Sequence, residues 1–370
     1  VPTEILSVQH YLKCKDRLAA MNIQILLIKG GQSPKQREAI HEALQSETPL
    51  LIIGTHALIQ DSVSIRNLGV LVIDEQHRFG VFQRLRLKNK GQYPHALYMT
   101  ATPIPRSLCL SYYGDLDKSV IEGMPAGREP IQTYFCKFSR LKKVADFCRT
   151  EIEKGHQVYL VFALINETDK VHAKALLDNF EGYSEQYFSG LKTGILHGQM
   201  KTQEKAERMQ AFKEKKVDVL FCTTVIEVGV DVPNANTIVI LNAERFGLSQ
   251  LHQLRGRVGR QPGAAHCFLV SDSKSKKTMG RLKAMLDSSN GFELSEADLK
   301  LRGPGEVLGT QQSGLPVFKL GNIQEDYPLL TAATDAAAEI LEKDPQLTKH
   351  LRLKRELKKH RSPLVTELLN

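Results

Sequence analysis

Two adjacent acids, Asp74 and Glu75, follow directly after a short apolar run, and His77 comes two positions later. The run, residues 70–73, is rich in β-branched side chains, which predicts a strand buried on both faces of a parallel sheet. Open α/β sheets bind ligands at the carboxyl ends of their strands, so the two carboxylates would lie at such an edge. The alternative is that Asp74 caps a following helix and that Glu75 is solvated.

A second segment with chemical potential is "QLHQLRGRVGRQPG", residues 250–263. Gln253, Arg257 and Arg260 lie at fixed offsets, and Gly256 and Gly259 alternate with them so that the backbone can come close to a partner. A guanidinium stays charged and binds phosphate oxygens in a planar fork. Beside a γ-phosphate it would stabilise the charge of the transition state. A plain basic patch is the alternative, but such patches rarely alternate arginine with glycine after a strand and a turn.

The elements that must position these residues repeat along the chain as strand-like runs separated by helical stretches. The runs are residues 50–54, 70–74 and 96–100, then 157–164, 194–198, 218–224, 237–241 and 266–270. A turn-rich segment at 125–130 separates the two groups, which predicts two parallel-sheet α/β domains. Ser33, Pro34 and Gln36 predict a helix start with a capping box.

The pattern changes after residue 272. Two helices joined at Asn290-Gly291 are predicted, followed by the glycine-rich loop "RGPGEVLGTQQSG" at 302–314. The tail at 349–361 holds seven Lys/Arg in thirteen residues on a helix-compatible pattern. This tail is either a solvated basic helix face or a surface that contacts phosphates.

Composition sets broad limits on the function. A chain of 370 residues has room for two or three domains, and its net charge of +9 favours a polyanionic partner. No apolar run has the length of a membrane span, which excludes a transmembrane protein of the helical type. The six scattered cysteines form no CxxC pair and are typical of reduced thiols in a cytosolic protein.

Several motifs occur together in a recognisable order. "DEQH" (74–77), "TATPIPR" (100–106), "TTVIEVGVDVP" (223–233) and "QLRGRVGR" (253–260) resemble motifs II, III, V and VI of superfamily 2 helicases. "PTEILSVQH" (2–10) and "GTHAL" (54–58) resemble motifs Ia and Ib. "DEQHRFGVFQR", "MTATPIPRSL" and "DLKLRGPGEVLGTQQSG" narrow the resemblance to the RecG family of branched-DNA translocases. The last of these is similar to the TRG motif, which the Mfd family shares, but "DEQH" in place of DEEH favours RecG.

This resemblance implies a fold and a set of roles. It implies two RecA-like helicase domains and a helical-hairpin TRG region, with ATP as substrate and Mg²⁺ as cofactor. Asp74 would hold the Mg²⁺, Glu75 would activate the attacking water, and Gln253, Arg257 and Arg260 would reach the γ-phosphate.

The resemblance also implies residues that line the nucleotide cleft from motif V, namely Gly229 and Asp231, although Asp231 is alternatively a turn residue before Pro233. His197 either contacts a phosphate or is a satisfied core histidine. The residues implied to contact DNA or to couple DNA to nucleotide are Thr3, Thr55, His77, Thr100, Thr102, His197, Glu227, Arg281, Arg302, Gln311 and Gln312.

One helicase element is missing from the sequence: no G-x-x-x-x-G-K-[ST] phosphate loop occurs. We therefore expect a carboxyl-terminal RecG-like fragment without the wedge domain and the phosphate loop, and inactive as an ATPase by itself. The expected domains are 1–128 (partial first helicase domain), 129–272 (second helicase domain) and 273–370 (TRG region and basic helices). The rival functions are an Mfd-type motor and a non-catalytic nucleic-acid-binding module.

The expected partners and location complete this interpretation. Double-stranded and branched DNA, including forks and Holliday junctions, would be the substrate, and single-stranded-DNA-binding protein is a further candidate partner. We expect a monomer without membrane contact, in the bacterial cytoplasm and associated with the nucleoid.

Overall fold

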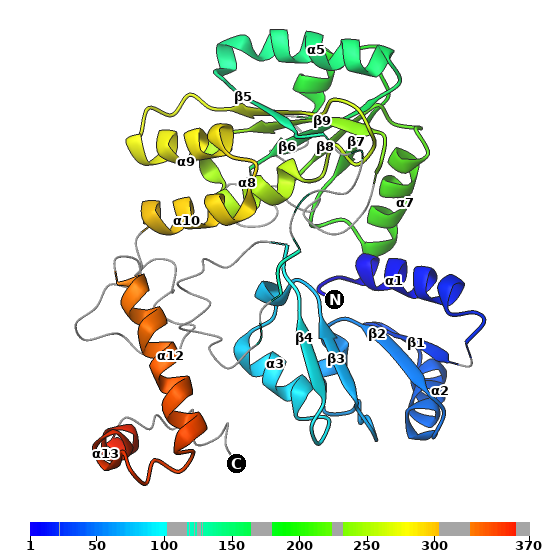
Figure 1. Cartoon of the computed structure of the whole chain (residues 1–370). Coiled ribbons are helices and arrows are strands. Elements are labelled where there is room, and N and C mark those ends of the chain that lie inside the picture. Colours follow the sequence, from blue (N-terminus) through cyan, green and yellow to red (C-terminus); the bar gives the residue numbers. More distant parts are fainter. Residues whose placement is uncertain are drawn as a thin grey trace. The chain divides into compact units, whose positions relative to one another are not determined.

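The computed structural model describes residues 1–21, 23–101, 117, 119–121, 123, 127, 129–163, 180–223, 232–302 and 326–359 (Figure 1). The chain divides into two compact units, and each is treated by itself below. One unit combines Val1–Thr102 with Pro125–Ser289, and the other combines Pro103–Met124 with Asn290–Asn370.

The first hundred residues form two small parallel sheets with helices beside them. β1 pairs with β2, and β3 pairs with β4. The capping box predicted at the start of α2 is confirmed, since Ser33 and Gln36 exchange hydrogen bonds. The elements are α1 (Glu4–Arg17), β1 (Gln24–Ile28), α2 (Pro34–Gln45), β2 (Leu50–Gly54), η1 (His56–Ile59), β3 (Val70–Ile73), η2 (Gln76–Arg78), α3 (Val81–Lys88) and β4 (His95–Tyr98).

The expectation that β3 is buried on both faces is wrong. Ile73 is buried and packs with Phe79 and Leu87, whereas Val70 and Val72 are 64% and 51% exposed. The exposed pair shares its face with Leu97 of β4, which is 54% exposed, because Val72 pairs with Leu97 in the register. An apolar run predicts a strand but cannot tell whether a distant element covers its second face.

A six-stranded, wholly parallel sheet forms the centre of the second half of this unit, with strand order β5-β10-β9-β6-β8-β7. The predicted α/β class with a parallel sheet is therefore confirmed. Its elements are β5 (Gln132–Cys136), η3 (Phe138–Arg140), α5 (Leu141–Glu153), β6 (Gln157–Phe162), β7 (Thr193–Leu196), α7 (Thr202–Lys213), β8 (Val219–Cys222), β9 (Ala235–Leu241), η5 (Ala243–Arg245), α8 (Leu248–Arg255), β10 (His266–Val270) and α9 (Lys276–Asp287).

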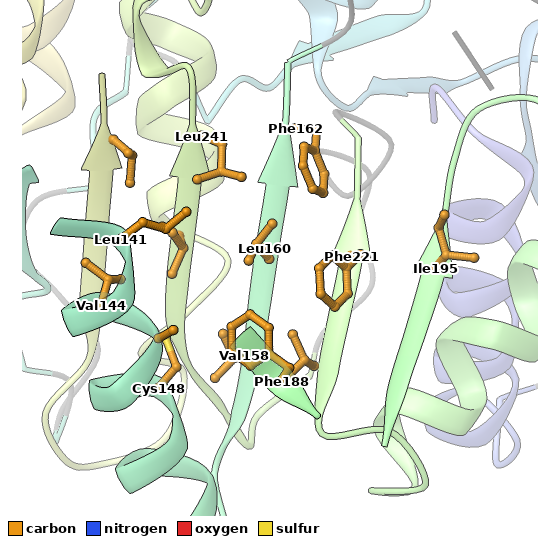
Figure 2. Close-up of a cluster of buried hydrophobic side chains, with 14 residues drawn as sticks. Leu141, Val144, Cys148, Val158, Leu160, Phe162, Phe188, Ile195, Phe221 and Leu241 are labelled. Atoms are coloured by element: carbon orange, nitrogen blue, oxygen red, sulfur yellow. The ribbon is translucent and has the colours of Figure 1, made fainter. Parts of the chain in front are cut away.

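The core of this half lies between α5 and the sheet, as Figure 2 shows. Leu141, Val144 and Cys148 of α5 face the strand residues Leu160 and Phe221, and all five are buried. Complete burial of one such apolar side chain contributes about 1.5–3 kcal/mol. The sheet therefore provides a firm base for the loops at its strand ends.

The second unit contains the helices α10 (Gly291–Arg302), α12 (Tyr327–Lys343) and α13 (Leu351–Lys359). The predicted helix boundary at Asn290-Gly291 and the predicted basic tail helix are both confirmed. Among the helices described, none is both long and apolar enough to cross a membrane.

Candidate functional site

The two acids singled out from the sequence lie at the carboxyl end of β3. Asp74 accepts the backbone N–H of Glu75 through Oδ1 at 2.9 Å. Glu75 has a left-handed backbone, with φ at 48°, and its Oε2 accepts the N–H of Ala101 at 3.4 Å. The side chain of Glu75 is 21% exposed, so its carboxylate is both restrained and accessible.

The next two residues connect this turn to β4. The N–H of Gln76 donates to the carbonyl of Met99 at 3.0 Å, and Met99 donates back to Ile73 at 2.8 Å. His77 Nδ1 lies 3.6 Å from Glu75 Oε2. Burial lowers the pKa of His77, although the Glu75 carboxylate opposes the shift, so the ring is neutral at pH 7.

The turn after β3 occurs a second time, after β9. Asn242 has φ at 52° where Glu75 has 48°, and a 3-10 turn follows in each case. Each turn then places a buried phenylalanine, Phe79 or Phe246, before a helix. The pattern R-F-G-x-x-Q, at 78–83 and 245–250, marks both copies in the sequence. This repeat is a sequence signal for the second turn, although the turn was not among the predictions.

The glutamine of each R-F-G-x-x-Q pattern caps the start of the following helix in the same way. Gln83 accepts the N–H of Gly80 at 2.9 Å, and Gln250 accepts the N–H of Gly247 at 3.1 Å. The two halves of this unit therefore use one local design, strand, left-handed residue, 3-10 turn and capped helix, at equivalent strand ends.

The arginines of "QLRGRVGR" follow from the second copy of this design. Gln253 lies on α8 and is half-buried, Arg257 is half-buried just beyond the helix, and Arg260 is exposed. Leu254 and Val258, both fully buried, anchor the segment between them. The loop thus presents two guanidiniums from a rigid base.

The two glycines of this segment differ in what they require. Gly259 has φ at 69°, and a Cβ there would lie 2.9 Å from the Cβ of Ala265 and 3.3 Å from Ile131. Gly256 has φ at −66°, and a Cβ there would meet nothing closer than 3.5 Å. Close approach within this domain therefore requires glycine at 259 but not at 256.

Sequence analysis missed Arg255, which is 3% exposed. Its Nη1 donates to the carbonyls of Met285 and Ser288, both at 2.9 Å, at the end of α9. In the opposite direction, Arg281 of α9 donates to the carbonyls of Phe246 and Glu244, at 3.0 and 2.9 Å. We call these four bonds the arginine clasp.

The clasp joins both ends of α8 to α9. The RecG resemblance implies that Arg281 contacts DNA or couples DNA to nucleotide, and that role stays a prediction. In the structure two donors of Arg281 are bonded to the turn before α8. A signal for Arg255 was present. It occupies the helical i+7 position from Leu248 and i+4 from Leu251, both fully buried, so periodicity places it in the apolar stripe.

His252 supports Arg255 from the same helix. Its Nδ1 lies 3.2 Å from Nη2 of Arg255. Burial and the neighbouring arginine lower the pKa of His252 from 6.5 to about 4. The neutral ring therefore accepts a hydrogen bond from the guanidinium N–H at pH 7.

The other predicted contacts are positioned as follows. Thr3 caps α1, accepting the N–H of Leu6 at 3.5 Å, and Thr55 begins η1. Thr100 follows β4 near Ala101. His197 follows β7, and burial lowers its pKa, against the nearby Glu204. DNA contact by these residues stays a prediction.

Some of the predicted residues fall outside the part of the chain that the structure describes. These are Thr102, Glu227, Gly229, Asp231, Gln311 and Gln312. Arg302 is the last residue of α10, but its side chain is likewise outside the described set.

The implied Mg²⁺ fits what the turn offers. Mg²⁺ in nucleotide sites is usually held by one or two carboxylates together with substrate phosphates. Asp74 Oδ2 lies 4.0 Å from His10 Nε2, and the Asp74 side chain is 26% exposed, so this oxygen is accessible. Among the described residues no group of three metal-binding side chains occurs, so any cation here would depend on the nucleotide for further ligands.

Three protein-family models match successive parts of the chain. The model described as "DEAD/DEAH box helicase" matches residues 1–109, and "Helicase conserved C-terminal domain" matches 137–262. The third, "ATP-dependent DNA helicase RecG, domain 3, C-terminal", matches 288–365. These matches follow the order of the motifs in the sequence.

Curated relatives named "ATP-dependent DNA helicase RecG" match nearly the whole chain. The protein from Synechocystis is 47% identical over 96% of this chain and 43% of its own length. The protein from Thermotoga maritima is 45% identical over 95% of this chain and 45% of its own length. The protein from Streptococcus pneumoniae is 45% identical over 96% of this chain and 54% of its own length. The chain spans about half the length of the curated relatives it matches.

Solved structures agree with this assignment. The structure titled "Structure of RecG bound to three-way DNA junction" has a TM-score of 0.67 at 44% identity, covering 89% of this chain and 42% of that one. Yeast Dbp5 bound to RNA and ADP BeF3 has a TM-score of 0.54 at 17% identity, covering 90% of this chain and 79% of that one, which shows the RecA-like helicase fold alone. With identities of 44–47% over 89–96% of its length to these relatives, this chain belongs to the RecG family of helicases.

Proposed function

We propose that this chain forms the motor of an ATP-dependent translocase that moves along double-stranded DNA and remodels branched DNA such as forks and Holliday junctions. The observation that carries the proposal is the acid pair at the end of β3, with Glu75 held in a left-handed turn. The family relatives named as DNA helicases, and one titled as bound to a three-way junction, support it.

In the proposed reaction Glu75 acts on water. Its carboxylate is fixed by the Ala101 N–H and lies beside neutral His77, so one oxygen can accept a proton from water that attacks the γ-phosphate. Asp74 would hold Mg²⁺, which when bound neutralises phosphate charge at this edge. The chain's own contribution is to orient the base and to keep it restrained.

Arg257, Arg260 and Gln253 are proposed to reach the γ-phosphate from the second sheet. The arginine clasp then connects the segment that holds these residues to the end of α9. Arg255 lies two positions before Arg257 and is bonded to Ser288, and α10 begins three residues later at Gly291. Movement of "QLRGRVGR" with the nucleotide would therefore carry the end of α9 and the start of α10 with it.

The test of this function uses Glu75→Gln in a polypeptide that carries this chain together with the further segments of its longer relatives. Nucleotide binding should persist, whereas DNA-stimulated hydrolysis should fall by about 10²-fold or more, as expected on loss of a general base. Glu47→Gln is the control, because its carboxylate is 86% exposed and pairs with the exposed Arg66 at 3.5 Å. Turnover of Glu75→Gln at the control rate would remove Glu75 from the reaction.

The same assay tests the rival function of a non-catalytic module. A non-catalytic nucleic-acid-binding module would bind DNA without turnover in every form of the protein. Lack of turnover by the 370-residue chain alone, binding of single-stranded-DNA-binding protein, a monomeric state and a nucleoid-associated cytoplasmic location stay predictions.

A further inference from the structure

The C-terminal helix α13 has a strongly cationic surface. Five of its nine residues are Lys or Arg, and Glu356 is its single acid. Arg352, Arg355 and Lys359 are exposed and follow i, i+3, i+7 spacing, which places them on one face of the helix. We call these three residues the cationic face.

Most of the charge on this face is not neutralised within the structure. Arg352 and Arg355 make no hydrogen bond or ion pair with any residue that the structure describes. Lys359 pairs with Glu356 at 2.6 Å, which satisfies one cation on its own helix. Two guanidiniums at i, i+3 spacing therefore remain available to an external anion.

The direction of α13 is fixed by a buried carboxylate. Asp344, at the end of α12, has a side chain only 5% exposed. Its oxygens accept the N–H of Thr348 at 2.8 Å and of Lys349 at 2.7 Å, and His350 Nδ1 lies 3.1 Å away. Desolvation by itself would raise the pKa of Asp344, but these hydrogen bonds hold the pKa well below its ordinary value.

Backbone strain in the same turn also indicates a fixed geometry. Leu347 has φ at 53°, a conformation that leucine rarely adopts, yet its side chain is 9% exposed and its N–H bonds to the Asp344 carbonyl at 2.9 Å. Such a residue persists only where its surroundings determine it. The turn at 344–350 is thus an ordered elbow, and the helix that it orients carries Arg352 and Arg355 on its exposed face.

We propose that the cationic face of α13 binds the phosphate backbone of duplex DNA, presented in a set direction by the Asp344 elbow. Arginine donors at i, i+3 suit a polyanion with regularly spaced charges. The contact would carry no sequence preference, because phosphates carry none.

An anionic membrane is the other surface that a basic helix could meet, and the residues of α13 fit it poorly. The apolar side opposite the cationic face consists of Leu353 and Leu357, with no aromatic residue, over nine residues. Interfacial membrane helices need a broader apolar face than this. The choice of duplex DNA as the polyanion rests on the proposed function.

The experiment measures binding of the 370-residue chain to a random-sequence duplex at several salt concentrations. The double variant Arg352→Gln/Arg355→Gln should lower the slope of log K against log salt by about two, since each lost phosphate contact removes about 0.9. The double variant Lys142→Gln/Lys143→Gln, two exposed lysines of α5, removes the same net charge and should leave the slope at the parent value.

A third variant, Asp344→Asn, separates the effect of the orientation of α13 on DNA binding from the effect of net charge. It makes the chain more positive, so simple electrostatic attraction predicts tighter binding, whereas loss of the elbow predicts weaker binding and a smaller slope. Because both arginines are exposed, their substitution leaves folding intact, which circular dichroism checks.

Several outcomes would overturn the proposal. They are no duplex binding by the parent chain, equal slopes for parent and arginine variant, or an equal loss in the lysine variant, which would indicate net charge alone. Preferential binding of phosphatidylglycerol vesicles that the arginine substitutions abolish would assign the helix to a membrane instead. If the parent chain binds DNA and the arginine variant keeps the parent slope, the proposal for α13 fails while the proposed motor function still stands. The two proposals can therefore be told apart.

Discussion

Replacing Arg255 with methionine should release α9 from α8. The guanidinium is 3% exposed and donates to two carbonyls in the last turn of α9, both at 2.9 Å. Methionine keeps the length of the apolar stem and removes the donors. The arginine clasp would then retain only the bonds from Arg281.

The expected size of the effect follows from two opposing terms. Hydrogen bonds from a charged donor contribute about 1.5–3 kcal/mol each, so two would contribute about 3–6 kcal/mol. Burying the guanidinium costs several kcal/mol, which the methionine variant no longer incurs. A net loss of about 2 kcal/mol remains, and it corresponds to about 30-fold faster opening.

Hydrogen exchange of the α9 amides in the 370-residue chain measures this opening directly. The control is Arg149→Met on α5, whose guanidinium also donates to two carbonyls, those of Tyr187 and Ser189, at 2.9 Å each. That variant should loosen residues 187–189 and leave α9 at the parent rate. Parent-like exchange of α9 in Arg255→Met would refute the view that this clasp holds the helices together.

Other substitutions test the loop, the histidine and the glycine. In the longer protein Arg302→Ala should keep DNA binding and most ATP turnover but lose fork conversion, with turnover and conversion measured on the same branched substrate. If both activities survive, the loop at 302–314 is a linker; if both are lost, Arg302 supports folding or nucleotide contact. His252 stabilises the fold as a neutral ring, because its pKa is lowered from 6.5 to about 4, so this stability is complete above pH 6.5 and lost as pH falls towards 4. The melting temperature of His252→Gln should therefore fall less than that of the parent as the pH is lowered from 6.5 to 4. An identical pH profile for the two proteins would contradict a stabilising role of the neutral His252 ring. Gly259→Ala should lower the melting temperature by the equivalent of about 1–3 kcal/mol through backbone strain and overpacking, while Gly256→Ala should leave it close to the parent; equal effects would refute the distinction.

Strands that carry an apolar run were predictable from the sequence, whereas the cover of each strand's two faces was not. β6, β8 and β9 are buried along their whole length, and each contains an apolar run, although β6 begins with Gln157 and β9 includes Asn236 and Thr237. β5 (Gln132–Cys136) lies at the edge of the sheet and alternates exposed with half-buried residues, so its sequence has no such run. The exposed face of β3 went unpredicted for a related reason, since cover is a tertiary property that a local pattern does not contain.

The candidate site was predictable in its residue types and less so in its contacts. Motif order singled out Asp74, Glu75 and the arginines of "QLRGRVGR", because the spacing of these residues within each motif is local. The partners of Arg255 lie thirty or more positions away, in α9. Periodicity could place Arg255 in the apolar stripe of α8, but nothing near it in the sequence identifies those carbonyls, so its partners came from the fold.

The repeated turn explains why the left-handed position after β3 is informative. Asparagine tolerates this conformation better than most residues, and Asn242 occupies it after β9, where no acid pair precedes the turn. Glutamate at the same position, Glu75, costs about 1 kcal/mol or more in backbone strain. The same scaffold thus accepts the less strained residue in one half and keeps the strained one where its carboxylate faces Ala101 and His77. Glu75→Asn should therefore preserve or raise the stability of the first half while abolishing hydrolysis in the longer protein, and a loss of both stability and activity would mean that Glu75 is retained for the fold rather than for the reaction.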